Sequence, residues 1–187
     1  MSANSHAEVC PWWLCFTFDN FVRRLLQNPF KILFPYLKEG YYVLDVGPGM
    51  GYFTIPAAKL IGATGRVVAA DLQKHMLVAI LRRAVKAGVQ DRIILHQTQP
   101  DRIAVSGPFD FSLVFWMVHE VPDRKRFLNE IAEVLKPGGT MLLAEPKLHV
   151  SKVNFNLTLN ICLEIGLQVS EQPKIFISNA VLLKKVR

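Results

Sequence analysis

The chain has 187 residues, of which 51% are hydrophobic and 20% charged, a balance that indicates one globular domain and excludes an intrinsically disordered chain. No apolar run approaches the roughly 18 residues of a membrane-spanning helix, so we expect none. The formal net charge of +7 fits a nucleic acid, an anionic surface or an acidic substrate as partner. The basic residues are scattered in small groups, however, which favours ordinary solvated faces.

Three cysteines, Cys10, Cys15 and Cys162, are an odd number in a chain of this length and predict a reducing, cytoplasmic setting. The N-terminus has no basic segment followed by an apolar one, so we expect no secretory signal. Four residues separate Cys10 from Cys15, with no third close thiol and no paired histidine. We therefore predict free thiols rather than a metal site.

Residues 1–40 are rich in aromatic and aliphatic side chains and predict one or two helices, broken at Asn28–Pro29 because the residue before proline disfavours helical geometry. This helical cap carries Trp12, Trp13, Phe16 and Phe18. They could form a lid over a binding site, pack the cap onto the sheet edge, or contact a second subunit in a homodimer. The sequence leaves these alternatives open.

From residue 41 onward, predicted strands alternate with predicted helices. Apolar runs predict strands at 42–46, 66–70, 92–96, 110–115 and 139–145. Helical spacing and turn signals predict helices at 51–61, 73–87, 99–104 (short), 123–136 and 151–165. Such alternation implies parallel strands with helices on both faces of the sheet, a doubly wound α/β fold.

Local signals fix the ends of several elements. Asp123 is placed to cap the helix at 123–136, and "KPGG" at 136–139 is a strong stop before the next strand. Val153, Leu157, Ile161 and Ile165 recur at a spacing of four and indicate the helix at 151–165.

Two further strands are predicted at 167–177 and 180–186. The two residues between them are too few for a crossover helix, so this pair must form an antiparallel hairpin. We predict a single domain over 1–187, with the helical cap at 1–40 and a Rossmann-like core at 41–187.

The stretch "YYVLDVGPGMG" places Gly47, Gly49 and Gly51 directly after the first strand of the core. Ligands of open α/β sheets bind beyond the carboxyl ends of the strands, and glycine allows a backbone to turn tightly beside them. Asp71 ends the next strand, where a carboxylate can accept hydrogen bonds from both hydroxyls of a ribose. This pattern fits NAD and S-adenosylmethionine equally.

Three features distinguish these two ligands. The dinucleotide fingerprint requires glycine at position 52, where this chain has Tyr52. Asp45, two residues before the first glycine, suits an ammonium or sulfonium group and would repel a pyrophosphate. A terminal antiparallel hairpin is also unusual for a dinucleotide domain. We therefore predict S-adenosylmethionine as the cofactor.

The sequence resembles class I S-adenosylmethionine-dependent methyltransferases. The matching stretches are "VLDVGPGMG", "VVAADLQ", "FDFSLVFWMVHEVPD" and "LKPGGTMLLAEP", and with the paired terminal strands they cover about 41–187. The resemblance implies a seven-stranded sheet of order 3-2-1-4-5-7-6, mostly parallel with an antiparallel C-terminal hairpin. The stretch from His119 to Asp123 is similar to the small-molecule branch that includes the ubiquinone and menaquinone C-methyltransferases.

The resemblance also implies roles for individual residues. Asp45 and the loop from Gly47 through Pro48 and Gly49 to Gly51 would hold the methionine part of the cofactor. Asp71 would bind the ribose, and Leu72 would lie beside the adenine. Phe115, Trp116 and His119 would face the methyl group and the substrate, with Trp116 also contacting the cofactor.

One contact departs from the family pattern. The family often places a short acidic or polar residue after strand 3, where it holds the adenine amino group. Here that region reads "LHQTQPDRI", and Gln97, Gln99 and Asp101 are all candidates. We place Gln97 with the predicted cofactor-binding residues.

Methyl transfer mainly needs alignment of the acceptor with the methyl group and exclusion of water. A base is needed only where the acceptor loses a proton, and His119, Glu120 and Glu145 are the candidates. Glu145 is expected to face the crevice from the end of strand 5. His119 could instead cap the helix that follows it, and we interpret Glu120 as a solvent-facing or structural residue.

Other functions remain as alternatives. A nucleic-acid methyltransferase would suit the charge, but the chain has "FWMV" after strand 4 instead of the Asn/Asp-Pro-Pro-aromatic run of amino-methylating enzymes. It also lacks the cysteine near strand 4 that a cytosine-C5 enzyme requires. A non-catalytic S-adenosylmethionine-binding protein is the other alternative. We predict methyl transfer to a small molecule.

Overall fold

The computed structural model describes residues 26–186. The predictions for Trp12, Trp13, Phe16, Phe18, Cys10 and Cys15 lie outside the described residues. Within the described part of the chain, no helix is long and apolar enough to cross a bilayer.

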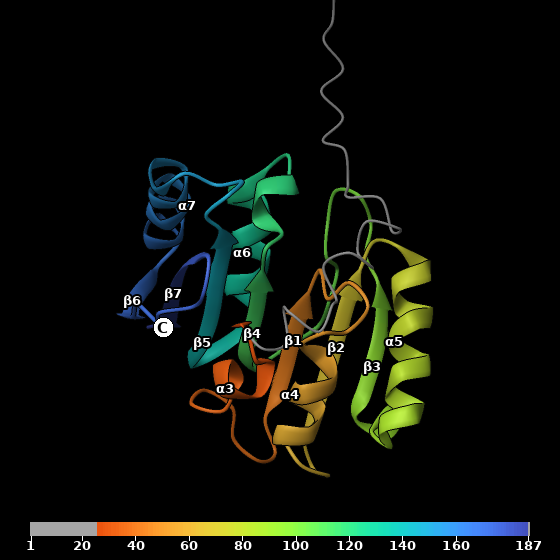
Figure 1. Ribbon diagram of the computed structural model, residues 1–187. Coiled ribbons are helices and arrows are strands. Elements are labelled where there is room, and N and C mark those ends of the chain that lie inside the picture. Colours follow the sequence, from red (N-terminus) through yellow and green to blue (C-terminus); the bar gives the residue numbers. More distant parts are fainter. Residues whose placement is uncertain (1–25, 187) are drawn as a thin grey trace, which may run out of the picture.

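One seven-stranded sheet forms the centre of the protein, in the order β3-β2-β1-β4-β5-β7-β6 (Figure 1). The strands are β1 (Tyr42–Val46), β2 (Arg66–Asp71), β3 (Ile93–Gln97), β4 (Phe109–Phe115), β5 (Leu135–Pro146), β6 (Leu167–Glu171) and β7 (Ser178–Lys185). Strands β1 to β5 pair in parallel, whereas β7 is antiparallel to both β5 and β6. The predicted doubly wound α/β fold, its strand order and its antiparallel hairpin are confirmed.

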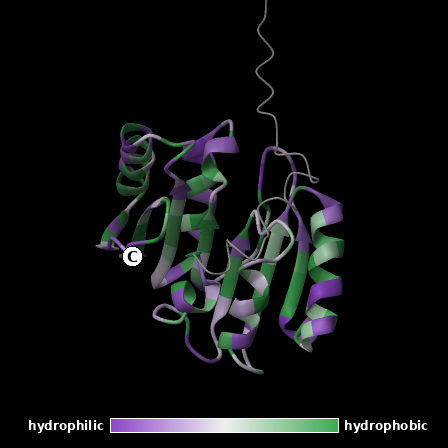
Figure 2. Cartoon of the chain, in the orientation of Figure 1, coloured by the Kyte–Doolittle hydropathy of each residue, from purple (hydrophilic) through white to green (hydrophobic). Residues whose placement is uncertain are grey.

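Helices cover both faces of this sheet (Figure 1). They are α3 (Pro29–Leu33), α4 (Thr54–Leu60), α5 (Lys74–Ala87), α6 (Arg124–Val134) and α7 (Lys152–Glu164), with short 3-10 turns η1 (Gln90–Arg92) and η2 (Val118–Glu120). Core residues of α3, α4 and α5 cluster on one face, and those of α6 and α7 on the other. Neighbours such as Val43 and Leu44 point to opposite clusters, so the central strands are largely hydrophobic on both faces (Figure 2).

Two of the predicted helix boundaries are present. The extended backbone of Asn28 precedes α3, and its side chain accepts hydrogen bonds from the N–H groups of Phe30 and Lys31. The Asp123 side chain accepts from the Arg126 N–H at 3.0 Å and caps α6 as predicted. The expected helix at 51–61 begins three residues later, at Thr54.

The short helix predicted at 99–104 is wrong. Gln99 and Arg102 form an isolated antiparallel bridge instead, and the Arg102 Nε donates to Gln99 Oε1 at 2.9 Å. The next N–H, that of Ile103, donates to Glu130 Oε2 on α6 at 2.7 Å. Because these backbone groups bond across a turn and to α6, no helical ladder forms.

The strand predicted at 167–177 is wrong beyond Glu171, where β6 ends. Residues 172–177 form a loop, since Pro173 has no N–H to donate to a sheet ladder. The loop is anchored at its end, where Ile177 O accepts from Lys147 N at 2.8 Å. The connection of the hairpin is therefore longer than the sequence indicates and reaches the carboxyl end of β5.

Strand β5 begins at Leu135, before the "KPGG" segment that was predicted to separate the helix from this strand. Leu135 pairs with Phe109 and Thr140 with Phe111, so the residues between Leu135 and Thr140 bulge out of the ladder. Helix α6 still ends at Val134, so the signal marks the end of the helix correctly but not the start of the strand.

Of the four residues whose spacing indicates α7, Ile161 and Ile165 pack partly buried against the core, but Val153 and Leu157 do not. Val153 and Leu157 are 69% and 54% exposed, whereas Phe155, Thr158 and Cys162 face the core. Phe155 and Cys162 belong to the hydrophobic cluster that α7 shares with α6. The exposed apolar face of α7 thus has no partner within the described residues.

This assignment of the buried face predicts the effect of two truncations on α7. Phe155→Ala should lower the free energy of unfolding by about 3–5 kcal/mol, because it leaves a cavity in the core. Leu157→Ala, on the exposed face, should change it by less than about 0.5 kcal/mol. Denaturant unfolding monitored by circular dichroism measures both, and a larger loss for Leu157→Ala would contradict the assignment.

Candidate functional site

A cavity of about 750 Å³ lies at the carboxyl ends of the parallel strands. Its wall includes Asp45 from β1, Asp71 from β2 and Phe115 from β4. In open α/β sheets ligands bind at this edge. They bind at the division between two neighbouring strands whose crossover connections leave in opposite directions. The sheet order places that division between β1 and β4.

The glycine loop after β1 follows the cavity wall. Gly47 and Gly49 have φ angles of +66° and +55°, which side chains rarely adopt. A Cβ on Gly47 would lie 3.1 Å from Met117 Cγ, whereas one on Gly49 would meet nothing within 4 Å. Gly47 therefore allows the loop to pack against the residues after β4, and Gly49 leaves its backbone open beside the cavity.

Asp45 is a buried carboxylate, and the side chain that hydrogen-bonds to it within residues 26–186 is neutral. Asp45 is 3% exposed, lines the cavity, and its Oδ2 accepts from Thr54 Oγ1 at 2.6 Å. Burial raises the pKa of Asp45 to about 7, because loss of water disfavours the charged form. A cationic ligand beside this carboxylate would restore its charged state.

Asp71 is the second carboxylate of the site. Its Oδ1 accepts from the Gln73 N–H at 2.8 Å, and the carboxylate also accepts from the N–H of Gly49. Burial raises the pKa of Asp71 to about 6, although these two hydrogen bonds lower it. Asp71 thereby ties the end of β2 to the glycine loop.

These groups fit S-adenosylmethionine better than a dinucleotide. Two buried carboxylates with raised pKa values line one cavity, which suits an ammonium group and ribose hydroxyls. Among residues 26–186 no lysine lines the cavity, and the arginines that do, Arg102 and Arg126, lie beyond β3 and on α6. Arg126 is already paired with Asp101 and Glu130. The glycine loop thus offers no basic side chain to a pyrophosphate.

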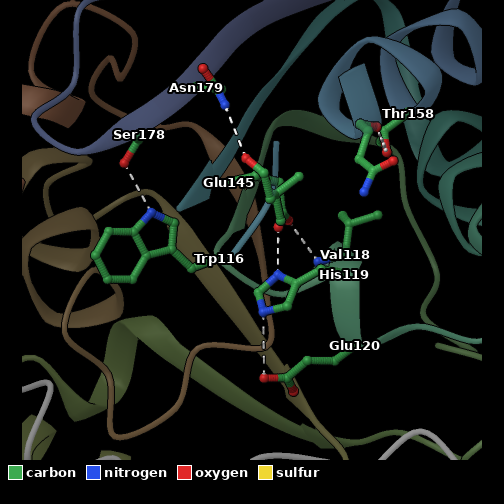
Figure 3. A network of polar contacts seen from close by, with 10 residues as sticks. Trp116, Val118, His119, Glu120, Glu145, Thr158, Ser178 and Asn179 are labelled. Atoms are coloured by element: carbon green, nitrogen blue, oxygen red, sulfur yellow. Dashed lines mark hydrogen bonds and ion pairs between the residues drawn. The ribbon is translucent and has the colours of Figure 1, made fainter. Parts of the chain in front are cut away.

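Trp116, directly after β4, lines the cavity in an unusual backbone conformation. Its φ angle is +60°, which is costly for a residue with a side chain and is typical of functional sites. The indole Nε1 donates to Ser178 Oγ at 2.9 Å, at the start of β7 (Figure 3). This bond fixes the ring between the end of β4 and the loop 172–177.

His119 and Glu145 form a hydrogen-bonded pair at the other end of the cavity (Figure 3). The His119 Nδ1 lies 2.5 Å from Glu145 Oε2, and Glu145 Oε1 accepts from the Val118 N–H at 2.8 Å. His119 Nε2 points toward Glu120, 3.9 Å from its Oε1. The hydrogen bond to Glu145 raises the pKa of His119, although burial lowers it.

Glu145 therefore does not face the crevice as the sequence led us to expect. It is 1% exposed, does not line the cavity, and both its oxygens are bonded to η2. The strand end does point Glu145 toward the site, but η2 covers it. Its contact with the cavity is made through His119.

Most residues predicted from the sequence line the cavity: Asp45, Gly47, Pro48, Gly49, Asp71, Leu72, Phe115, Trp116, His119 and Glu120. Gly51 and Gln97 do not. The Gln97 side chain bonds to Leu72 O at 3.4 Å on the exposed side of β3, whereas Gln99 and Asp101 are in the wall. Gly51, with φ +83°, lies against Ile80 and starts the turn into α4.

Several wall residues were not predicted. His149 lines the cavity and lies edge-on to His119, with ring centroids 6.0 Å apart, and Thr54, which is outside the wall, holds Asp45. Gln27 donates to Phe176 O at 2.7 Å and joins the start of the described chain to the loop 172–177. No spacing rule marks Gln27, because it reaches the loop 172–177 from a part of the chain far away in the sequence. Among residues 26–186, no group of histidine, cysteine, aspartate and glutamate is arranged to hold a metal ion.

The family profile described as "Methyltransferase domain" matches residues 43–139, more than half of the chain. The chain belongs to the methyltransferase domain family. The class I S-adenosylmethionine-dependent methyltransferase predicted from the sequence is thereby confirmed.

Curated relatives of this methyltransferase include the ubiquinone/menaquinone biosynthesis C-methyltransferase UbiE of Pasteurella multocida, 30% identical over 70% of this chain and 50% of that protein. The demethylmenaquinone methyltransferase of Bacillus velezensis is 34% identical over 58% of this chain and 47% of that protein. The chain thus spans about half the length of these relatives.

Two solved structures share the fold. A SAM-dependent methyltransferase from Aquifex aeolicus superposes with a TM-score of 0.83 at 24% identity, over 95% of this chain and all of that one. The [4+2]-cyclase SpnF superposes with a TM-score of 0.73 at 14% identity, over 85% of this chain and 81% of that one. At these identities the likeness shows the fold alone.

The burial of Asp45 predicts opposite effects of Asp45→Asn on stability and on ligand binding. Its pKa is about 7 in the folded protein and near 3.8 when exposed, so the folded state binds the extra proton between these values. The free energy of unfolding therefore falls as pH rises through this window. At pH 8 the free energy of unfolding of Asp45→Asn should exceed that of wild type by at least about 1 kcal/mol. At pH 4 the two free energies should be closer together.

The same variant should bind S-adenosylhomocysteine about 10- to 100-fold more weakly at pH 8, since it loses a charge-assisted hydrogen bond to the ammonium group. Thermal unfolding at the two pH values and calorimetric titration measure the two effects. If ligand-free Asp45→Asn were less stable than wild type at pH 8, the conclusion that the charged form of Asp45 destabilises the folded protein would be wrong.

Proposed function

We propose that this chain transfers the methyl group of S-adenosylmethionine to a small-molecule acceptor. The observation that carries the proposal is the cavity itself, where Asp45 and Asp71 line one end and the His119–Glu145 pair meets the other. One end suits the ammonium and ribose groups of the cofactor, and the other offers a base. An acceptor between them would lie against both.

The cofactor, when bound, supplies a methyl group on a sulfonium, which is a good leaving group. The chain has to orient it and exclude water. In the proposed arrangement Asp45 binds the ammonium group, the Gly47–Gly49 backbone follows the methionine part, and Asp71 accepts from the ribose hydroxyls. Gln99 and Asp101, as wall residues, are better placed than Gln97 for the adenine amino group.

His119 is the proposed general base. Glu145 Oε2 accepts the Nδ1–H of His119, which leaves the lone pair of Nε2 for a proton from the acceptor. When the cofactor gives its methyl group to the acceptor atom and leaves as a neutral thioether, Nε2 of His119 would take the proton that this atom loses. Glu145 acts as a positioning residue, because it reaches the acceptor only through the imidazole.

The acceptor end of the cavity is largely apolar and aromatic, with Trp116, Leu148, Phe176 and Ile177 in its wall. This lining favours a flat apolar acceptor with an ionisable hydroxyl or activated carbon beside His119. The relatives are named for C-methylation in ubiquinone and menaquinone biosynthesis and for demethylmenaquinone, so a hydroquinone ring is the first acceptor to test. A homodimer, a cytoplasmic setting and the absence of a nucleic-acid substrate stay predictions from the sequence.

A protein that uses this fold without methyl transfer is the second candidate, and the likeness to the cyclase SpnF favours keeping it. Such a protein would bind the cofactor and leave its methyl group in place. Turnover therefore separates the two: formation of S-adenosylhomocysteine with any acceptor supports methyl transfer.

We expect calorimetric titration of the full chain to give micromolar binding of S-adenosylhomocysteine and none of NADH. Asp71→Ala should weaken binding at least about 10-fold, because the ribose hydroxyls lose a buried charged acceptor. Asp91→Ala, on the exposed turn η1, is the matched control and should bind like wild type. Binding of NADH, or of neither ligand, would refute the proposed function.

The pair of His119 and Glu145 predicts a pH profile. His119 must be neutral to act as a base, so the rate should rise with pH through its raised pKa. His119→Ala should lower kcat about 100-fold or more. Glu145→Gln should lower kcat and move the rising limb to lower pH, because the imidazolium loses its charged partner.

To test this pair, rates of methyl transfer from labelled S-adenosylmethionine to a hydroquinone are measured at saturating cofactor. The pH is varied from about 5 to 9, a range that includes the values at which histidine titrates. Glu120→Gln serves as the comparison and should move the limb in the same direction by less, since Glu120 lies farther from the imidazole than Glu145 does and raises the pKa of His119 less. An unchanged profile in Glu145→Gln would reduce Glu145 to a structural role.

A further inference from the structure

Four large hydrophobic side chains are exposed beside the mouth of the cavity. Leu148, Val153, Phe176 and Ile177 are 82%, 69%, 49% and 37% exposed, and we call them the apolar rim. All but Val153 also line the cavity, and Val153 lies in the first turn of α7. Contiguous exposed apolar surface at a cavity mouth is typical of an interaction site.

The rim is built on backbone that hydrogen bonds hold together. Lys147 N donates to Ile177 O at 2.8 Å, which joins the segment after β5 to the loop 172–177. Asn179 Nδ2 donates to Val150 O at 3.4 Å, and Val150 N closes a turn on Pro146 O at 2.8 Å. The two segments are therefore joined through their backbones, and Leu148, Phe176 and Ile177 line the same cavity.

Exposed lysines surround the rim. Lys147, Lys152 and Lys174 are each next to or near a rim residue in the chain, and none has an ion-pair partner among residues 26–186. The stretches 146–163 and 172–187, which carry the rim, contain no aspartate or glutamate.

The acidic residues that border these stretches are already engaged. Glu164 pairs with Lys125 at 2.9 Å, Glu171 accepts from the Tyr36 hydroxyl at 3.2 Å, and Glu145 is buried under His119. The basic residues at the start of α6 differ from the rim lysines, since Arg126 is paired with Asp101 and Glu130. The surface around the rim is therefore both apolar and positively charged.

We propose that the apolar rim docks on the surface of an anionic lipid bilayer. Leu148 and Phe176 would enter the headgroup region, and Lys147, Lys152 and Lys174 would lie against lipid phosphates. Exposed apolar side chains flanked by lysines are the combination by which proteins bind such surfaces without spanning them. Docking itself does not depend on the proposed function, although it would open the cavity toward the lipid.

Other occupants match these residues less well. In a symmetric dimer the same patch meets itself, so the unpaired lysines would approach their own copies. A nucleic acid would contact the lysines but would leave the exposed aliphatic side chain of Leu148 without an apolar partner. Only a bilayer surface satisfies the charge and the apolar surface together.

The test is co-sedimentation of the full 187-residue chain with vesicles of phosphatidylcholine alone or with about 30% phosphatidylglycerol, an anionic surface that attracts basic residues. We expect binding to the anionic vesicles only, and weaker binding at high salt because the attraction is screened. Lys147→Glu/Lys152→Glu/Lys174→Glu should lower the partition coefficient by about 100-fold, at about fivefold per lysine. Leu148→Ser/Phe176→Ser should lower it at least about 10-fold.

Matched control variants change the same residue types on exposed positions of α4 and α5. Lys59→Glu/Lys86→Glu and Leu81→Ser/Val85→Ser should sediment like wild type. Thermal unfolding of each variant establishes that it is folded, and binding of S-adenosylhomocysteine is followed separately, so that loss of docking is distinguished from failure of the proposed function.

Three results would overturn the proposal. The first is no binding to anionic vesicles. If Leu148→Ser/Phe176→Ser then also converts an oligomer to a monomer, the rim is assigned to contact with a second copy of the chain. The second is an equal loss of binding in the control variants, which would mean that only net charge matters. The third is vesicle binding that survives both sets of rim substitutions.

Discussion

Three buried carboxylates at the ends of parallel strands are the constraint on which the site depends. Asp45, Asp71 and Glu145 end or nearly end β1, β2 and β5, and they are 3%, 8% and 1% exposed. Desolvating a carboxylate costs stability unless dipoles or charges compensate it. Here the partners are a threonine hydroxyl, backbone N–H groups and one imidazole, and none is a lysine or arginine. The charges therefore stay available to a ligand and to His119.

The sequence predicts the framework and the two cofactor carboxylates well. Asp45 and Asp71 follow unbroken apolar runs, and a parallel strand brings the residue at its carboxyl end to the ligand edge wherever the helices lie. Glu145 follows the same rule, but its exposure depends on η2, a short turn from another part of the chain that covers it. Position along a strand is a local property, whereas coverage is decided by tertiary packing.

The incorrect predictions have the same origin. A spacing of four identified α7 but not its buried face. Val153 and Leu157 follow that spacing, yet their side chains do not pack against the core. The loop 172–177 resembles a strand in composition, yet Pro173 and the bond to Lys147 turn it toward the cavity. Both deviations place hydrophobic residues where burial alone would not put them. Departures from local rules often mark functional surface.

Acidic and basic side chains lie in different parts of the molecule. Carboxylates line the part of the cavity over β1 and β2, and basic residues elsewhere, such as Lys125 and Lys136, are paired with Glu164 and Asp110. By contrast, Lys147, Lys152 and Lys174 belong to stretches without acidic residues, and each is close in the chain to an exposed apolar side chain of the rim. A scattered basic sequence can thus fold into a segregated surface. Net charge alone cannot reveal this, because it sums residues that the sheet order separates in space.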